Sequence, residues 1–157
     1  MNLEDFIETP SQNYSDDELQ AGVSELLNVL NENPYQVILI IKNCICPSSY
    51  ILRDLAKKME LQHCVDKLSI LFNKHLNELV DLCVWSWHDL QRLIDSQPSY
   101  LEKIMKSVGA NDDFLQRLQG DASNSQEIIS YIKDLSSDCE LPEQFAELFQ
   151  YSIIPRL

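Results

Sequence analysis

The sequence predicts an all-α protein, an irregular bundle of eight or nine helices. Apolar residues recur three and four positions apart through most of the chain, as on one face of a helix. One run, Val37–Ile41, could be a buried strand, but a lone strand has nothing to pair with. Only 3 glycines and 6 prolines interrupt 157 residues, few for a loop-rich fold. A short α-solenoid of antiparallel helix pairs is the alternative; the bundle is favoured because no fixed repeat period is found.

The bundle is expected to form around one long central helix at Leu61–Trp87. This stretch contains neither Gly nor Pro, and its apolar stripe is wide enough for a helix that is covered on more than one side. The stripe consists of Cys64, Val65, Leu68, Leu71, Phe72, Leu76, Leu79, Val80, Leu82 and Cys83.

Residues 1–14 are expected to form an acidic N-terminal tail, followed by a single helical domain at residues 15–157. Phe6 and Ile7 lie among acidic residues, and Thr9-Pro10 breaks any helix that starts there. The segment is either a strap that packs its apolar residues onto the domain, or an acidic peptide that docks on a partner.

Recognisable end signals divide the first half of the domain into helices. Ser15 and Glu18 form a capping box for a helix that ends near Asn31 to Asn33. Pro34 opens a helix to about Cys46, and Pro47 stops it. Ser48 or Ser49 caps the next helix, which is expected to turn Ile51, Leu52, Leu55, Ala56 and Met59 inward. Its water-facing side is expected to carry Arg53, Asp54, Lys57 and Lys58.

The second half of the domain is divided in the same way, with a mobile polar loop expected at residues 121–125. The expected first residues or caps of its helices are Ser86, Pro98, Asn111, Ser125 and Pro142. Two of these helices are expected to end at Gly109 and Gly120. A second loop is expected at residues 136–141.

The formal net charge is −13, and the acidity is concentrated at the two ends of the chain. The first 41 residues hold eight acidic residues and no Lys or Arg, whereas residues 42–133 hold twelve acids and eleven bases. Binding to nucleic-acid backbones or anionic membranes needs clustered Lys and Arg, so neither is expected. No apolar run approaches the ~18–20 residues of a membrane span.

The N-terminus lacks the basic-then-apolar pattern of a secretory signal, which predicts an intracellular protein, cytoplasmic or nuclear. The five cysteines are then expected to be reduced thiols. Their spacing matches no zinc motif, and three scattered glycines cannot form a phosphate-binding loop. We therefore expect no metal, no cofactor and no enzymatic activity.

These exclusions favour a non-enzymatic helical adaptor or complex subunit that binds another protein through a helix groove or an aromatic face. The partner is expected to carry a basic surface or an amphipathic helix, since the chain is acidic. The candidate contact residues are Trp87, Trp85 and Tyr50, because aromatic side chains are common binding anchors, and Phe6 and Ile7, the apolar residues of the acidic tail. The alternatives are an acidic inhibitor that mimics nucleic acid, and a helical enzyme with an unrecognised site.

Overall fold

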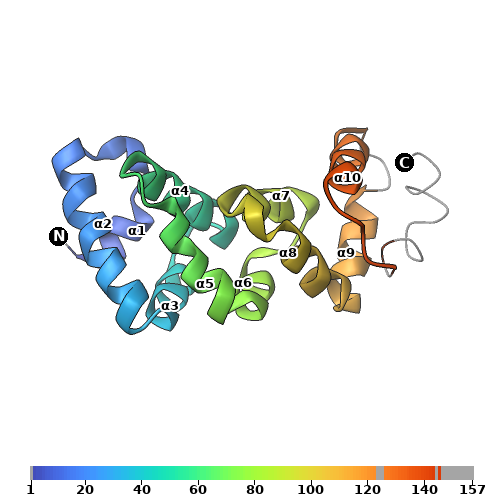
Figure 1. The fold of residues 1–157 in the computed structure, drawn as a ribbon, viewed down its shortest axis with the longest axis horizontal. Helices are drawn as coiled ribbons and strands as arrows, with labels where there is room; N and C mark the ends of the chain where they lie inside the picture. The colour runs from blue at the N-terminus through green and yellow to red at the C-terminus, as the bar shows by residue number, and fades with distance from the viewer. Residues whose placement is uncertain (1, 123–125, 144, 146–157) are drawn as a thin grey trace.

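A computed structural model describes residues 2–122, 126–143 and 145, and every regular element in these ranges is a helix. This confirms the predicted all-α class. The helices follow one another along the long axis of the molecule, with α1 and α2 at one end and α9 and α10 at the other (Figure 1). The α-helices are α1 (Leu3–Glu8), α2 (Asp16–Glu32), α3 (Tyr35–Asn43), α4 (Ser48–Leu61), α5 (Ser69–Lys74), α6 (Leu76–Cys83), α7 (Trp87–Ser96), α8 (Leu101–Gly109), α9 (Asp112–Ala122) and α10 (Gln126–Asp138). Three short 3₁₀ helices connect them: η1 (Ser11–Asn13), η2 (Val65–Leu68) and η3 (Pro98–Tyr100).

The capping signals of the first half are confirmed at α2. The Glu18 amide donates to Ser15 Oγ at 3.3 Å, and the Ser15 amide donates to Glu18 Oε1 at 3.0 Å. These reciprocal bonds satisfy two backbone donors that the first helical turn leaves without partners. The apolar run Val37–Ile41 lies in α3, so the helical interpretation of this run is confirmed.

The start of α4 differs from the prediction. Pro47 occupies the cap position, and Ser48 is the first helical residue without capping the helix through its side chain. The Ser49 hydroxyl instead donates to Asp89 Oδ1 of α7 at 2.6 Å. Lys58, expected to face water, is completely buried, because the N-terminal segment covers that side of α4.

The expected long central helix at Leu61–Trp87 is wrong. The α4 helix ends at Leu61, and the chain then turns at His63, whose φ of 57° is left-handed. The His63 amide donates to Glu60 O at 3.0 Å and the Cys64 amide to Met59 O at 2.9 Å. This pair of bonds is the Schellman motif, which usually has Gly at the left-handed position. Two further breaks, at His75 and at Val84 to Ser86, divide the rest into α5, α6 and the start of α7.

The second half follows the predicted helices with shifted ends. Ser86 caps α7 and Asn111 caps α9 through their side-chain oxygens. Gly109 is the last residue of α8 but has no left-handed φ; a Cβ there would lie 2.9 Å from Pro142, so close packing requires glycine.

Other expected features of the second half need correction or lie outside the described ranges. Gly120 does not end α9, which continues to Ala122, and α10 continues to Asp138. The Ser125 cap, most of the loop at residues 121–125 and the last helix beyond Phe145 lie outside the described residues.

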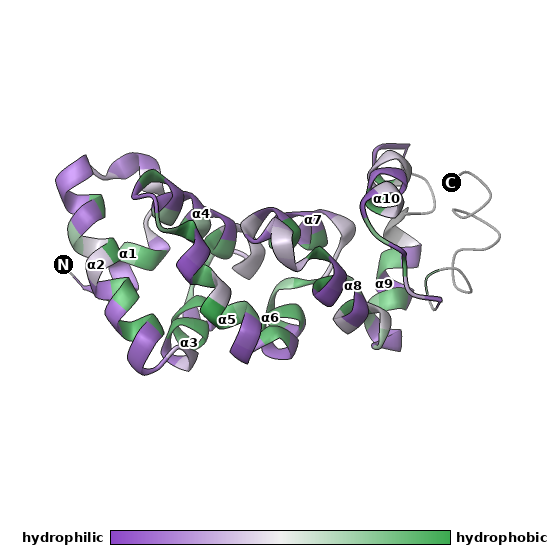
Figure 2. Cartoon of the chain, in the orientation of Figure 1, coloured by the Kyte–Doolittle hydropathy of each residue, from purple (hydrophilic) through white to green (hydrophobic). Residues whose placement is uncertain are grey.

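One continuous core of buried apolar side chains runs from Ile7 in α1 to Phe145. The hydrophobic faces of the helices turn toward one another, and the hydrophilic faces point outward (Figure 2). The α1 helix packs on α2, α3 and α4, while α4 packs along α7. Each helix in the described ranges is too short or too polar to cross a membrane.

Candidate protein-binding surface

The loop between α3 and α4 and the loop between α6 and α7 lie on either side of a hollow of about 530 Å³. The second loop ends at a local signal, the Ser86 cap of α7. The expected helix to about Cys46 is shorter: α3 ends at Asn43, and Pro47 takes the cap position of α4 instead of stopping α3. We call this feature the aromatic hollow, since Tyr50 and Trp85 line it. Its lining is Cys46, Pro47, Ser48, Tyr50, Leu82, Cys83, Trp85, Ser86, His88, Asp89 and Arg92.

Large apolar side chains are exposed at the aromatic hollow. Trp85 is 62% exposed and Tyr50 is 50% exposed. Ile45, next to the lining residue Cys46, is 95% exposed. A folded chain gains nothing by leaving such side chains in water, so a group of three of them is typical of an interaction surface.

The Asp89 carboxylate joins the two loops of the hollow. Its Oδ1 accepts from the Ser49 hydroxyl at 2.6 Å and from Arg92 Nη1 at 3.2 Å. Its Oδ2 accepts from the Trp85 amide at 3.1 Å. The Asp89 amide in turn donates to Ser86 Oγ at 3.2 Å. A single side chain of α7 thus fixes the start of α4 and the backbone that carries Trp85.

Each exposed ring is held by an arginine. Arg92 Nη2 donates to the Tyr50 hydroxyl at 2.6 Å, and its guanidinium carbon lies 3.8 Å from the centre of the Tyr50 ring. The Arg117 guanidinium carbon lies 4.5 Å from the Trp85 ring and 4.7 Å from the Phe114 ring. Arginine stacked on an aromatic face stabilises the ring orientation. The arginines therefore restrict the side-chain freedom of the two rings in the folded chain.

The other predicted contact residues are buried. Trp87 is 1% exposed: its indole Nε1 donates to Leu118 O at 2.7 Å, and its ring lies 6.0 Å from that of Phe145. Phe6 and Ile7 are 0% exposed. The Phe6 ring fills the space above Gly22, where a Cβ would lie 2.3 Å from ring atoms. Packing in the core explains why Trp87, Phe6 and Ile7 are apolar, and only Trp85 and Tyr50 remain at the surface.

Four of the five thiols have pKa values shifted away from activation as nucleophiles. Burial raises the pKa of Cys44, Cys64 and Cys139, and it raises the pKa of Cys83 to about 12. A reactive cysteine needs the opposite shift, toward the thiolate. In the described part of the chain, no three His, Cys, Asp or Glu side chains lie together in a way that could hold a metal ion.

Sequence reasoning missed four residues of this surface: Ile45, Asp89, Arg92 and Arg117. Asp89 could have been found, because Ser86 and Asp89 have the spacing of a helix cap and its third residue. The arginines meet their rings only in space, 42 positions apart for Arg92 and Tyr50. Ile45 follows the apolar run of α3 and looks like a core residue.

No family model, curated protein or solved structure matches the chain.

Proposed function

We propose that this protein is a non-enzymatic helical adaptor or complex subunit, and that it binds another protein through the aromatic hollow. The observation that supports it most is the exposure of Trp85, Tyr50 and Ile45 beside one concave surface. Trp and Tyr are the residues most often found as binding hot spots. The raised thiol pKa values of Cys44, Cys64, Cys83 and Cys139 support the non-enzymatic part of the proposal.

The proposed place of action is the cytoplasm or the nucleus. All five cysteines are free thiols, which fits a reducing compartment.

The test is affinity capture from host lysate with the full chain, the Trp85→Ala variant and the Tyr50→Ala variant. We expect specific partners to be lost or reduced by about tenfold or more with Trp85→Ala, since truncating a hot-spot tryptophan costs 2 kcal/mol or more, roughly, in binding. Quantitative mass spectrometry of the captured proteins gives the measurement.

The matched control is Leu61→Ala. Leu61 is 52% exposed, similar to Tyr50, but it ends the 14-residue α4 whose first turn carries Tyr50. The two positions are therefore about 16 Å apart along the helix axis. A partner whose capture falls with Leu61→Ala but not with Trp85→Ala or Tyr50→Ala would show that another surface binds.

A further inference from the structure

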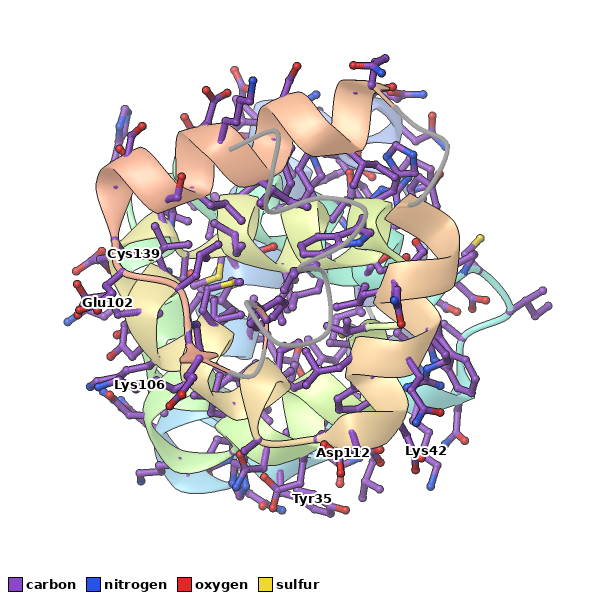
Figure 3. All side chains as sticks on the ribbon, turned by 90° about the vertical axis from the view of Figure 1, so that its right-hand side faces the viewer. Tyr35, Lys42, Glu102, Lys106, Asp112 and Cys139 are labelled. Atoms are coloured by element: carbon purple, nitrogen blue, oxygen red, sulfur yellow. The ribbon has the colours of Figure 1, made fainter. Side chains whose placement is uncertain are left out.

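A second concave surface lies between α10 and the segment formed by α7, η3 and α8. It has a volume of about 740 Å³, and we call it the α10 groove. Figure 3 shows Glu102 of α8 and Cys139, just after α10, at the same edge of the molecule. The lining is Gln91, Ile94, Asp95, Pro98, Ser99, Leu101, Glu102, Lys103, Tyr131, Asp134, Leu135 and Asp138.

Carboxylates stand on both walls of the α10 groove. Asp95 and Glu102 come from the α7–α8 wall, and Asp134 and Asp138 come from α10, where a spacing of four residues puts them on one face. All four are exposed, and none is within 4.0 Å of a Lys or Arg nitrogen of the described residues. The one cation of the lining, Lys103, directs its ammonium nitrogen to the Tyr100 ring, 5.1 Å from its centre.

The α10 groove also has apolar lining residues, and one of its lining residues, Tyr131, has a polar atom without a partner in the described part of the chain. Ile94 and Leu135 are buried, and Leu101 is half-buried. The Tyr131 hydroxyl oxygen is buried and has no hydrogen-bond partner among the described residues. Burial and the nearby Asp95 charge raise the pKa of Tyr131, so this phenol stays neutral. A buried hydroxyl without a partner is uncommon, and a ligand that supplies an N–H group would satisfy it.

We propose that the α10 groove binds a basic amphipathic helix of another protein. The apolar face of that helix lies on Ile94, Leu101 and Leu135, and its Lys or Arg side chains pair with the carboxylates of the two walls. The groove carboxylates complement the Lys or Arg side chains at contact. The net charge of −13 on the whole chain also attracts a basic segment before contact. This surface is separate from the aromatic hollow, so the chain has two faces for partners.

The probe is a fluorescein-labelled synthetic helix of about 14 residues, four turns, with lysines on one face and leucines on the other. Binding to the full chain is measured by fluorescence anisotropy. Four competitors accompany it: the unlabelled peptide itself, the same peptide with Glu for every Lys, a peptide of the same composition in non-amphipathic order, and spermine. We expect only the unlabelled basic amphipathic peptide to compete well. Equal competition by spermine or by the non-amphipathic peptide would overturn the proposal.

Two charge variants separate the groove from the net charge of the protein. Asp134→Asn/Asp138→Asn removes two groove carboxylates, and Glu25→Gln/Glu32→Gln removes two exposed carboxylates of α2 at the far end of the molecule (Figure 1). We expect the first to weaken peptide binding about tenfold or more and the second less than about twofold. Equal losses would show that only overall charge attracts the peptide.

Tyr131→Phe tests this polar atom of the α10 groove with two readouts. We expect it to weaken peptide binding by roughly two- to tenfold, the effect of one hydrogen bond, while thermal stability stays the same or rises. A purely structural tyrosine would leave binding unchanged, and that result would remove Tyr131 from the site. Trp85→Ala is expected to bind the peptide as the wild type does; a loss in this variant would place the peptide on the aromatic hollow and reject the α10 groove.

Discussion

The ammonium nitrogen of Lys58 lies 2.6 Å from the carbonyl oxygen of Phe6 and 3.2 Å from that of Ile7. A side chain of α4 therefore caps the C-terminal end of α1, where carbonyls have no partner within the helix. The same nitrogen pairs with Asp54 at 3.0 Å. The Phe6 and Tyr14 rings lie beside it, with centres 5.0 and 5.9 Å away. One buried lysine thus connects the N-terminal segment to α4.

Lys58→Met keeps the size of this side chain and removes the ammonium. We expect the free energy of unfolding to fall by about 1–3 kcal/mol, since the Phe6 and Ile7 carbonyls lose their buried donor. Urea unfolding measures it. Lys57→Met, at the exposed neighbouring position, is the control and should change stability by less than about 0.5 kcal/mol. Equal stabilities of the two variants would mean that Lys58 does not hold the N-terminal segment.

Gly22→Ala and Gly120→Ala make the same substitution in two environments. A Cβ at Gly22 would lie 2.3 Å from the Phe6 ring, so we expect a loss of about 1–3 kcal/mol and faster proteolysis before Ser15. A Cβ at Gly120 meets nothing within 4 Å, and alanine there should stabilise α9 by roughly 0.5–1 kcal/mol. Thermal unfolding gives both values. A neutral Gly22→Ala would contradict the close packing of α1 on α2.

Local signals were sufficient to predict most helices from the sequence. Ser15, Ser86 and Asn111 are caps in the structure because their side-chain oxygens accept from amides of the following turn. Such bonds involve residues two or three positions apart, so the sequence contains both partners. The helical state of Val37–Ile41 followed from the absence of a second strand.

The break at His63 could not be predicted in the same way. A left-handed residue usually is glycine, and here the Schellman bonds form around a histidine. The apolar spacing continues across the break because α4, η2 and α5 all face the same core. Periodicity therefore reports burial on both sides of a turn without revealing the turn. Likewise, nothing near Lys58 in the sequence indicates that Phe6 and Ile7, 52 and 51 positions away, cover it.

The candidate surface was predicted in part. Tyr50 and Trp85 were chosen as aromatic residues, yet only the fold determines that Trp85 is exposed while Trp87 is buried. In a β-strand, residues two positions apart point to the same side. Here the Ser86 cap lies between Trp85 and Trp87 and turns the chain, so the two rings point to different environments. The pairing of each exposed ring with an arginine depends on tertiary structure alone.

Trp87→Phe and Trp85→Phe should differ in stability and in fluorescence. Trp87→Phe removes the 2.7 Å bond to the buried Leu118 carbonyl, which we expect to lower the free energy of unfolding by about 1–3 kcal/mol. Trp85→Phe should change it by less than about 0.5 kcal/mol. The Trp87→Phe protein retains only Trp85, whose emission should be red-shifted and easily quenched by acrylamide. A blue-shifted, protected Trp85 would contradict an exposed ring.

Asp89→Asn should loosen the aromatic hollow without removing a contact residue. Asparagine offers one acceptor oxygen where the carboxylate accepts three hydrogen bonds, from Ser49, Arg92 and the Trp85 amide. We expect faster hydrogen exchange at Trp85 and reduced capture of partners that depend on Trp85. Asp81→Asn, on the exposed side of α6, is the matched control and should alter neither. Unchanged exchange in Asp89→Asn would show that Asp89 does not position the loop.

Stability should depend on alkaline pH through Cys83. Burial raises the pKa of its thiol to about 12, whereas a cysteine of an unfolded chain ionises near about pH 8.5. Between these values only the unfolded chain releases the thiol proton. The contribution of Cys83 to stability is therefore complete below about pH 8.5 and falls by roughly 1.4 kcal/mol per pH unit above it. The advantage of wild type over Cys83→Ala, measured by urea unfolding, should therefore shrink by roughly 2 kcal/mol between about pH 8 and about pH 10. Val80→Ala, a buried and non-titrating position of the same helix, should keep a constant difference from wild type across this range. A constant difference for Cys83→Ala as well would show that its thiol ionises as readily in the folded protein as in the unfolded chain.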